Sequence, residues 1–335
     1  MSRDVASQMT LSLNGGNIMS YAAGISIKDP VFKAMEGWLY KYKKNSVKEA
    51  TFDRLLISLK MMRSYSIAFM RIMDLTTDDV QGYINHLLCD GYAYTTIKKQ
   101  YNLITAFVKF LLGEGAPIRP VYLNVSLPIA ENIKKPKKEI VTYNKVEQVK
   151  LCKAIDADGE DASCAVLLML ENGLRAGEVL ALSWEDIDFD RRAVRIHRTL
   201  VHPASRSKGF VQEGAKSKTS NRTIPLSSKV MAALDRMLVN TDAPAGIIFR
   251  SVRFPDQSMG YNALRKHIQK LCRKAQLEYR GMHVFRHTFA TNCYYKGCEI
   301  KKLSKLLGHA SVTITYNTYI HLYGDALEEL RSVVE

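Results

Sequence analysis

Hydrophobic residues in the first third of the chain recur every three or four positions, as they do on one face of an amphipathic helix. The clearest stripe starts after Thr76 and Asp79, which have the spacing of a helix-capping box. A second stripe stops at Gly113. The pattern predicts a small helical bundle over residues 28–120, preceded by a tail over residues 1–27. Its helical segments are expected near residues 31–44, 48–64, 80–88 and 97–111.

The pattern changes after residue 120. Residues 121–141 contain prolines and the run Lys-Lys-Pro-Lys-Lys, with little apolar periodicity, so this segment is expected to be a basic linker. Over residues 142–335, helical stripes are mixed with alternating apolar positions that predict short strands. We therefore predict an α-helical N-terminal domain and a mixed α/β domain, mainly α with a small antiparallel sheet. In the second domain, helices are expected near residues 144–156, 228–239, 260–275, 284–296 and 299–307.

Charge indicates a polyanionic partner. The 335-residue chain has a formal net charge of +15, and 47% of its residues are hydrophobic, enough for two domain cores. Residues 28–138 contain 18 Lys and Arg against 10 Asp and Glu, and residues 139–335 contain 29 against 22. Because both parts are basic, both are expected to touch the same polymer. Charge alone does not separate nucleic acid from anionic lipid.

Cysteine spacing and hydropathy exclude several classes. The six cysteines form neither a CxxC pair nor a zinc-site pattern, so they are expected to be reduced thiols, with no metal and no cofactor. No stretch approaches the roughly 20 apolar residues of a membrane span, and the start of the chain lacks a secretion signal. The expected location is the cytoplasm, and no membrane partner is expected.

The polar motifs of the second domain suit phosphodiester transfer. Attack on phosphorus builds negative charge on the non-bridging oxygens, and arginine can stabilise it with two parallel hydrogen bonds. A tyrosine nucleophile also needs a proton acceptor, because free tyrosine has a pKa of about 10. Four segments contain such groups: Glu171-Asn-Gly-Leu-Arg175-Ala-Gly-Glu178, the hairpin-like stretch from Lys216 through Lys218 to Leu226, His283-Val-Phe-Arg286-His287, and Leu306-Leu-Gly-His309 followed by Tyr319.

These four segments, in this order, resemble the catalytic signature of the tyrosine recombinases, the phage integrase family. The basic, helical N-terminal part resembles that family's core-binding domain, so the resemblance covers roughly residues 29–335. It implies a site-specific DNA recombinase that cuts and rejoins strands through a 3′-phosphotyrosyl intermediate, for integration, excision or inversion of a DNA segment. Each motif residue taken singly would more often be structural, but the ordered set favours catalysis.

The resemblance also implies residue roles. Arg175 and Arg286 would hold the scissile phosphate, and His309 would hydrogen-bond it. Tyr319 would attack the phosphorus, with His283 accepting the phenolic proton. A lysine of the hairpin would protonate the departing 5′ oxygen.

Several assignments stay open. The hairpin lysine is Lys216 or Lys218, and we favour Lys216 because it leaves room for a longer turn. Tyr316 lies three residues before Tyr319, but the Tyr-x-His context favours Tyr319. Asn172 stands where the family often has threonine, at a position that is not catalytic. Two further residues are expected to support the site: Glu178, by positioning the first arginine or capping its helix, and His287, which flanks the second.

Double-stranded DNA recombination sites are the expected partner, enclosed by the two domains. Four subunits on two sites would exchange strands, and the amphipathic segment over residues 325–335 is expected to dock on a neighbouring subunit. Accessory DNA-bending or excision-directing proteins are possible partners, and the protein would associate with the nucleoid. The lysines expected to contact DNA are Lys43, Lys44, Lys98, Lys99, Lys134, Lys135, Lys137 and Lys138.

Two other functions are compatible with the residues. A type IB topoisomerase uses the same covalent chemistry and would relax supercoiled DNA without a defined site. A DNA-binding regulator would bind without forming a covalent adduct. The complete set of catalytic residue types and the Leu-Gly-His element favour the recombinase.

Overall fold

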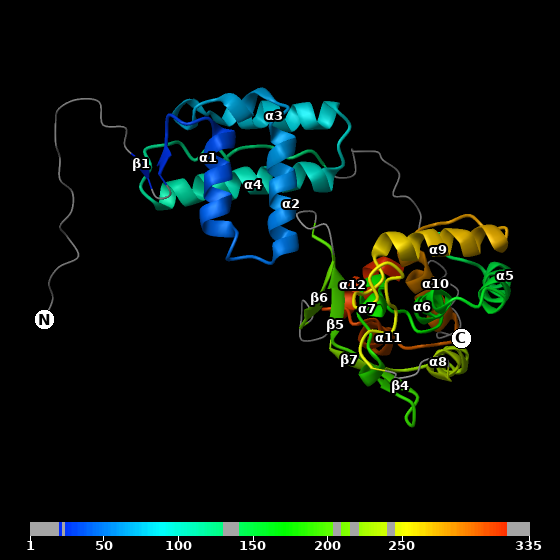
Figure 1. The fold of residues 1–335 in the computed structure, drawn as a ribbon. Coiled ribbons are helices and arrows are strands. Elements are labelled where there is room, and N and C mark those ends of the chain that lie inside the picture. Colours follow the sequence, from blue (N-terminus) through cyan, green and yellow to red (C-terminus); the bar gives the residue numbers. More distant parts are fainter. Residues whose placement is uncertain are drawn as a thin grey trace, which may run out of the picture. The chain divides into compact units, whose positions relative to one another are not determined.

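The computed structural model describes residues 20–21, 24–129, 141–203, 209–214, 221–239 and 245–319. The chain divides into two compact units, Met1–Lys137 and Lys138–Glu335 (Figure 1). Lys134, Lys135, Lys137 and Lys138 of the expected linker, and Lys216 and Lys218, lie outside the described residues. None of the described helices is long and apolar enough to cross a bilayer.

The N-terminal unit is a helical bundle around one apolar core. Thr76 caps α3 in a complete capping box, in which its hydroxyl accepts from the backbone N–H of Asp79 and the Asp79 carboxylate accepts from the backbone N–H of Thr76. The predicted box is therefore confirmed. The elements are β1 Ser20–Tyr21, β2 Ile25–Ser26, α1 Val31–Trp38, the π-helical turn Leu39–Lys43, α2 Glu49–Met62, the 3₁₀ turns Ser66–Phe69 and Ile72–Asp74, α3 Thr77–Cys89 and α4 Tyr94–Gly113.

The bundle extends beyond both expected ends. Strands β1 and β2 pair within the segment expected to be a tail, and Ile25 is buried in the core. Val121 is also buried there, and the Tyr101 hydroxyl donates to the carbonyl oxygen of Tyr122. The first residues of the expected linker 121–141 are thus part of the folded unit. Burial of a few apolar side chains outweighs the local proline-rich composition.

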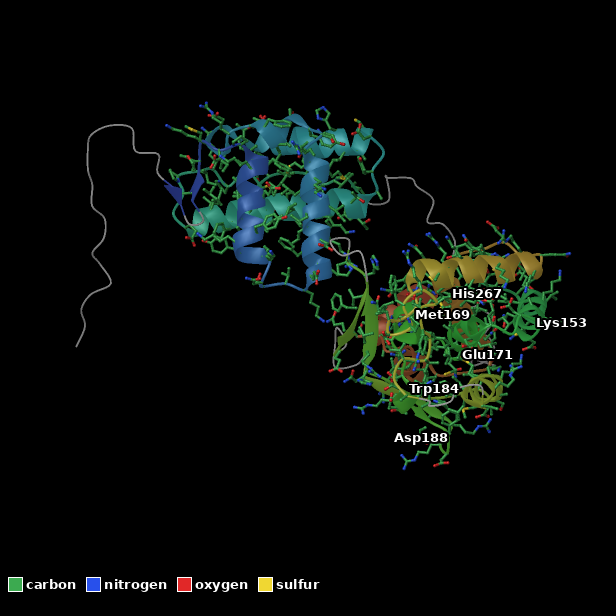
Figure 2. The ribbon with its side chains drawn as sticks, in the orientation of Figure 1. Lys153, Met169, Glu171, Trp184, Asp188 and His267 are labelled. Carbon is green, nitrogen blue, oxygen red and sulfur yellow. The ribbon has the colours of Figure 1, made fainter. Side chains whose placement is uncertain are left out.

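The C-terminal unit is built around α6, Asp161–Glu171. Every residue from Ala162 to Leu170 is buried, because α6 packs against α5, α7, α8, α9 and α10 (Figure 1). Figure 2 shows Met169 of α6 in the interior and Lys153 of α5 at the surface. The other helices are α5 Lys145–Asp156, α7 Ala176–Leu180, α8 Ser228–Val239, α9 Tyr261–Lys274, α10 Met282–Tyr295, α11 Ile300–Leu307 and α12 Val312–Tyr319, with a 3₁₀ turn at Trp184–Asp186.

The C-terminal unit also contains short antiparallel strands, of which β5 contacts α7 and β7 contacts α11. Their bounds are β3 Ile187–Asp188, β4 Ala193–Ile196, β5 Arg198–Val201, β6 Phe210–Glu213 and β7 Arg222–Pro225. Strand β4 pairs with β3 and β7, and β5 pairs with β6. Strands β4 and β5 follow each other directly, and β7 and β6 run antiparallel to them. The structure describes the hairpin-like stretch expected at Lys216–Leu226 from residue 221 onward, where β7 lies, and the segment with Lys216 and Lys218 lies outside the described residues.

Candidate active site

Arg175 lies at the turn from α6 into α7. Gly173 makes this turn with φ of 69°, and a Cβ there would approach the Phe289 ring to 2.3 Å, so the position requires glycine. Arg175 is the N-cap residue of α7, and its backbone N–H and Nη1 donate to the Glu178 carboxylate at 2.9 and 2.7 Å. The Arg175 side chain remains 34% exposed. Its guanidinium is thus oriented by the protein and still accessible to an anion.

Arg286 projects from α10 and is only 5% exposed. Nη1 donates to the carbonyl oxygen of Gly173 at 2.8 Å, and Nη2 donates to that of Leu307 at 2.5 Å. Arg175 Nη2 donates to the next carbonyl, that of Gly308, at 3.3 Å. The two arginines therefore meet at the end of α11, although they come from different helices. A buried guanidinium held by carbonyls keeps its charge fixed in place.

His309 follows this carbonyl pair. Gly308 ends α11 in the left-handed conformation, with φ of 63°, which turns the chain toward α12. His309 Nδ1 lies 2.7 Å from the hydroxyl of buried Thr315. Desolvation, then the positive charges of Arg286 and Arg175, lower the pKa of His309 to about 4. The imidazole is consequently neutral near pH 7 and can donate one N–H.

His283 lies one helical turn before Arg286 on α10. Part of the residue is exposed, but desolvation of the ring and the charges of Arg286 and Arg175 lower its pKa, against an opposing effect of Glu178. A neutral imidazole near pH 7 can accept a proton. His287, on the same helix, adds to the positive field that lowers the pKa of His309.

Glu178 positions Arg175 and caps its helix as expected, whereas its second partner, Arg222, is not among the expected site residues. Burial raises the pKa of Glu178, but hydrogen bonds and charge from Arg222, and the charge of Arg175, outweigh it and lower that pKa to about 2. In the sequence, Arg222 opens the run Arg-Thr-Ile-Pro-Leu, which predicts a short strand and no role in the site. Its signal in the sequence is weak, because an arginine beside a β-branched run is usually a surface residue.

Tyr319 is the last residue of α12, and α12 packs against α11. The side chain of Tyr319 lies outside the described structure, and so do the whole residues Lys216 and Lys218. Tyr316 is on the same helix and is exposed. The described residues thus gather Arg175, Glu178, Arg286, His309 and, by its electrostatic coupling, His283.

The expected DNA-contacting lysines of the N-terminal unit lie beside aromatic rings. The ammonium groups of Lys43, Lys44 and Lys98 lie 5.2, 5.7 and 5.7 Å from the ring centroids of Trp38, Tyr40 and Tyr94. Lys44, Lys98 and Lys99 are exposed. In the described part of the chain, none of these lysines forms an ion pair with a carboxylate, so their charges remain available to phosphates.

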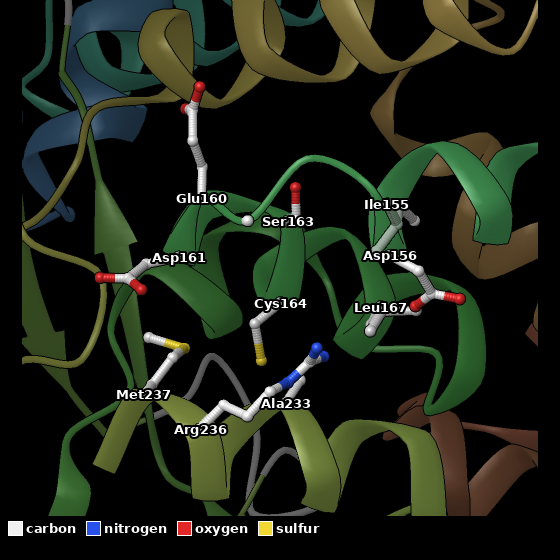
Figure 3. A pocket seen from close by; sticks show the side chains of 11 residues that line it. Ile155, Asp156, Glu160, Asp161, Ser163, Cys164, Leu167, Ala233, Arg236 and Met237 are labelled. Atoms are coloured by element: carbon white, nitrogen blue, oxygen red, sulfur yellow. The ribbon is translucent and has the colours of Figure 1, made fainter. Parts of the chain in front are cut away.

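The C-terminal unit also contains a cavity and a cluster of charged residues that include none of the proposed catalytic residues. A cavity of about 150 Å³ is lined by α5, α6 and α8 residues, including Cys164 and Arg236 (Figure 3). Near it, Asp158, Glu160 and His267 could approach one ion, but Lys270 lies 3.0 Å from Asp158 and 2.5 Å from Glu160. Lysine charges therefore already balance these carboxylates, and the cluster is an ion-pair network.

Comparisons with known proteins agree with the geometry. Residues 141–325 match the sequence model of the phage integrase family. The chain is 28% identical over 308 residues to a XerC-like tyrosine recombinase of Caldanaerobacter subterraneus subsp. tengcongensis, covering 86% of this chain and 78% of the relative. It is 23% identical to the transposase of transposon Tn916 from Enterococcus faecalis, covering 82% and 70%.

Solved structures share the fold. The Tn1549 transposon integrase in complex with transposon right end DNA superposes with a TM-score of 0.73 at 19% identity, covering 91% of this chain and all of that one. A lambda integrase tetramer bound to a Holliday junction gives 0.57 at 18% identity, covering 83% and 78%. The predicted fold class, a helical domain followed by a mainly helical catalytic domain with small antiparallel sheets, is thereby confirmed.

Proposed function

The chain belongs to the phage integrase family of tyrosine recombinases, and we propose how its residues carry out the reaction. It is a site-specific DNA recombinase that cuts and rejoins strands through a 3′-phosphotyrosyl intermediate, for integration, excision or inversion of a DNA segment. The observation that best supports the residue roles is the meeting of Arg175 and Arg286 at the adjacent carbonyls of Leu307 and Gly308, directly before His309.

Arg175 and Arg286 bind the non-bridging oxygens of the scissile phosphate. Their charges oppose the negative charge that develops as phosphorus becomes five-coordinate. Neutral His309 donates its free N–H to the same phosphate. Loss of one such donor should lower the cleavage rate on the order of 10²- to 10³-fold.

Tyr319 supplies the nucleophile. Its phenolic oxygen forms a bond to phosphorus, the bond from phosphorus to the 5′ oxygen breaks, and a 3′-phosphotyrosyl link and a free 5′-hydroxyl result. His283 accepts the phenolic proton, and Lys216 donates a proton to the departing 5′ oxygen, with Lys218 as the alternative donor. Attack by a 5′-hydroxyl of another strand reverses these steps and rejoins the DNA.

Glu178 and His287 support this machinery without touching the reacting atoms. Glu178 fixes Arg175 through two hydrogen bonds, one from its backbone N–H and one from Nη1 of its side chain. His287 helps to lower the pKa of His309, the smallest of the effects that do so.

The recombinase acts on double-stranded DNA sites. We propose that Lys43, Lys44, Lys98 and Lys99 bind phosphates from the N-terminal unit, as do Lys134, Lys135, Lys137 and Lys138. Assembly as a tetramer on two sites is supported by the lambda integrase tetramer that shares the fold. Residues 325–335 would dock on a neighbouring subunit, and DNA-bending or excision-directing proteins would set the direction. The site of action is then the nucleoid DNA.

A nicked suicide substrate tests the proposal, because it traps the covalent adduct by losing the short 5′ fragment. The recombination site is first identified from DNA that the purified protein cleaves. The parent protein should form the adduct in the presence of EDTA, since guanidinium and ammonium groups supply the positive charge. Tyr319→Phe should form none, and Tyr316→Phe should retain it. An adduct with Tyr319→Phe, or its loss only with Tyr316→Phe, would refute the assignment of the nucleophile.

A further inference from the structure

Arg222 is anchored more completely than any role in strand pairing requires. Nη1 and Nη2 donate to the two Glu178 oxygens at 3.0 and 2.9 Å. Nε donates to the carbonyl oxygen of Leu306 at 2.7 Å. The side chains of Arg222 and Glu178 are each only 7% exposed. A planar fork in this geometry fixes the orientation of the carboxylate that it binds.

The ion pair between Arg222 and Glu178 affects the net charge beside Arg175. Glu178 also accepts from Arg175 Nη1 at 2.7 Å, so one carboxylate lies between two guanidinium groups. With both arginines present, this triad has a net charge of about +1 at neutral pH, because the carboxylate is ionised and both guanidiniums remain protonated. Without Arg222, Glu178 would neutralise Arg175 alone, and Arg175 would attract a phosphate less strongly.

Arg222 also fixes strand β7, which follows Lys216 and Lys218 in the sequence. It is the first residue of β7, opposite Ile196. At the other end of β7, Asn172 Nδ2 donates to the carbonyl oxygen of Pro225 at 2.8 Å. The strand is therefore attached at both ends to the segment around Arg175.

The same side chain packs on the end of α11. A Cβ on Gly308 would lie 2.8 Å from Arg222 Nη1 and 3.1 Å from its Cδ and Cζ. Together with the bond to Leu306, this contact holds the residues that precede His309. The segments that carry Arg175 and His309 thus converge on one side chain.

We propose that Arg222 is a positioning residue of the recombination reaction: it offsets the charge of Glu178 so that Arg175 remains free to bind phosphate, and it joins β7 to α7 and α11. This inference rests on the proposed function. Its distinctive consequence is that the Glu178 carboxylate becomes inhibitory when Arg222 is absent.

The test compares single-turnover cleavage of the suicide substrate by full-length variants. Arg222→Gln should lower the rate by about tenfold or more, which corresponds to about 1.4 kcal/mol, because the Glu178 carboxylate is left to neutralise Arg175. Arg222→Gln combined with Glu178→Gln should recover several-fold of that loss, because the uncompensated carboxylate is gone. Arg222→Lys keeps the charge and should fall between the parent and Arg222→Gln. Exposed Arg250, whose side chain donates only to nearby backbone carbonyls, provides the matched control as Arg250→Gln.

Thermal denaturation and DNA affinity are measured on the same proteins. If Arg222→Gln does not fold, three other variants are compared with the parent: Arg222→Lys, Glu178→Gln and the double variant Arg222→Lys, Glu178→Gln. Loss of Glu178 should then change the cleavage rate less in the Arg222→Lys protein than in the parent. A parent rate retained by Arg222→Gln, or a double variant no faster than Arg222→Gln, would overturn the inference. Absence of any adduct with the parent would instead overturn the proposed function.

Discussion

His309 Nδ1 lies 2.7 Å from the hydroxyl oxygen of Thr315, which is fully buried in α12. The bond joins the residue after the end of α11 to the helix that ends at Tyr319. When the Thr315 hydroxyl donates to Nδ1, the proton of the neutral ring is on Nε2, and Nε2–H is the donor available to a phosphate. One contact therefore attaches His309 to the helix that carries the nucleophile and, in this tautomer, leaves Nε2–H for the phosphate.

Replacement of Thr315 by valine should lower the rate of covalent adduct formation by about fivefold, because one neutral hydrogen bond contributes about 1 kcal/mol. The change keeps the volume of the side chain but removes the partner of Nδ1. Single-turnover cleavage measures it, with Thr313→Val on the exposed face of the same helix as the control. Equal rates for both variants would show that the tautomer does not matter.

The pH dependence of cleavage should reflect depressed histidine pKa values. Protonated His283 cannot accept the phenolic proton, so the rate falls as pH decreases through its pKa. Because that pKa is lowered from the ordinary value of 6.5, the acidic limb of kcat/KM should have its midpoint below 6.5. Glu178 opposes this shift, so Glu178→Gln should move the limb to still lower pH. A midpoint at or above 6.5 in the parent protein would contradict this assignment of the base.

Gly308→Ala should reduce the cleavage rate by more than its loss of stability explains. The left-handed backbone costs an alanine about 1–2 kcal/mol, and its Cβ would also displace Arg222. Gly297→Ala is a close control, since Gly297 has φ of 75° but a Cβ added there would meet no described atom within 4 Å. Both variants should lose similar stability in thermal denaturation, whereas only Gly308→Ala should lose cleavage beyond that expected from the unfolded fraction.

The lysines of the N-terminal unit should contribute to affinity without sequence preference. Lys98→Gln and Lys99→Gln should each weaken DNA binding and reduce the slope of log Kd against log salt concentration by about one. Lys33 is the control, because its ammonium already pairs with Asp29 at 2.9 Å. Fluorescence anisotropy over a salt series measures the slope. An effect of Lys33→Gln equal to that of Lys98→Gln would argue against specific phosphate contacts.

Local patterns in the sequence predict most of the helices. The expected segment 228–239 has the same bounds as α8, and 260–275, 284–296 and 299–307 differ from α9, α10 and α11 by one or two residues. Such agreement is possible because helix formation depends on periodicity and capping over a few turns. The Thr76 and Asp79 capping box was predictable for the same reason.

Contacts between distant segments were not predictable in this way. Expecting Ile25 to lie in a tail and Val121 in a linker was wrong, because both are buried by contacts with a core that local composition does not reveal. The π-helical turn at Leu39–Lys43 likewise interrupts the expected helical segment 31–44, and the sequence offers no local signal for it.

The sequence by itself determined which residue types are available for catalysis, their order, and the family to which they belong, because these depend on short motifs. Only the tertiary structure decided how they are held: Arg175 and Gly308 are 133 residues apart, and Arg222 and Leu306 are 84 apart. These bonds join side chains to backbone carbonyls, which every residue possesses, so no motif marks the acceptor. The packing of α6, α10 and α11 determines which backbone carbonyls lie next to the guanidinium groups.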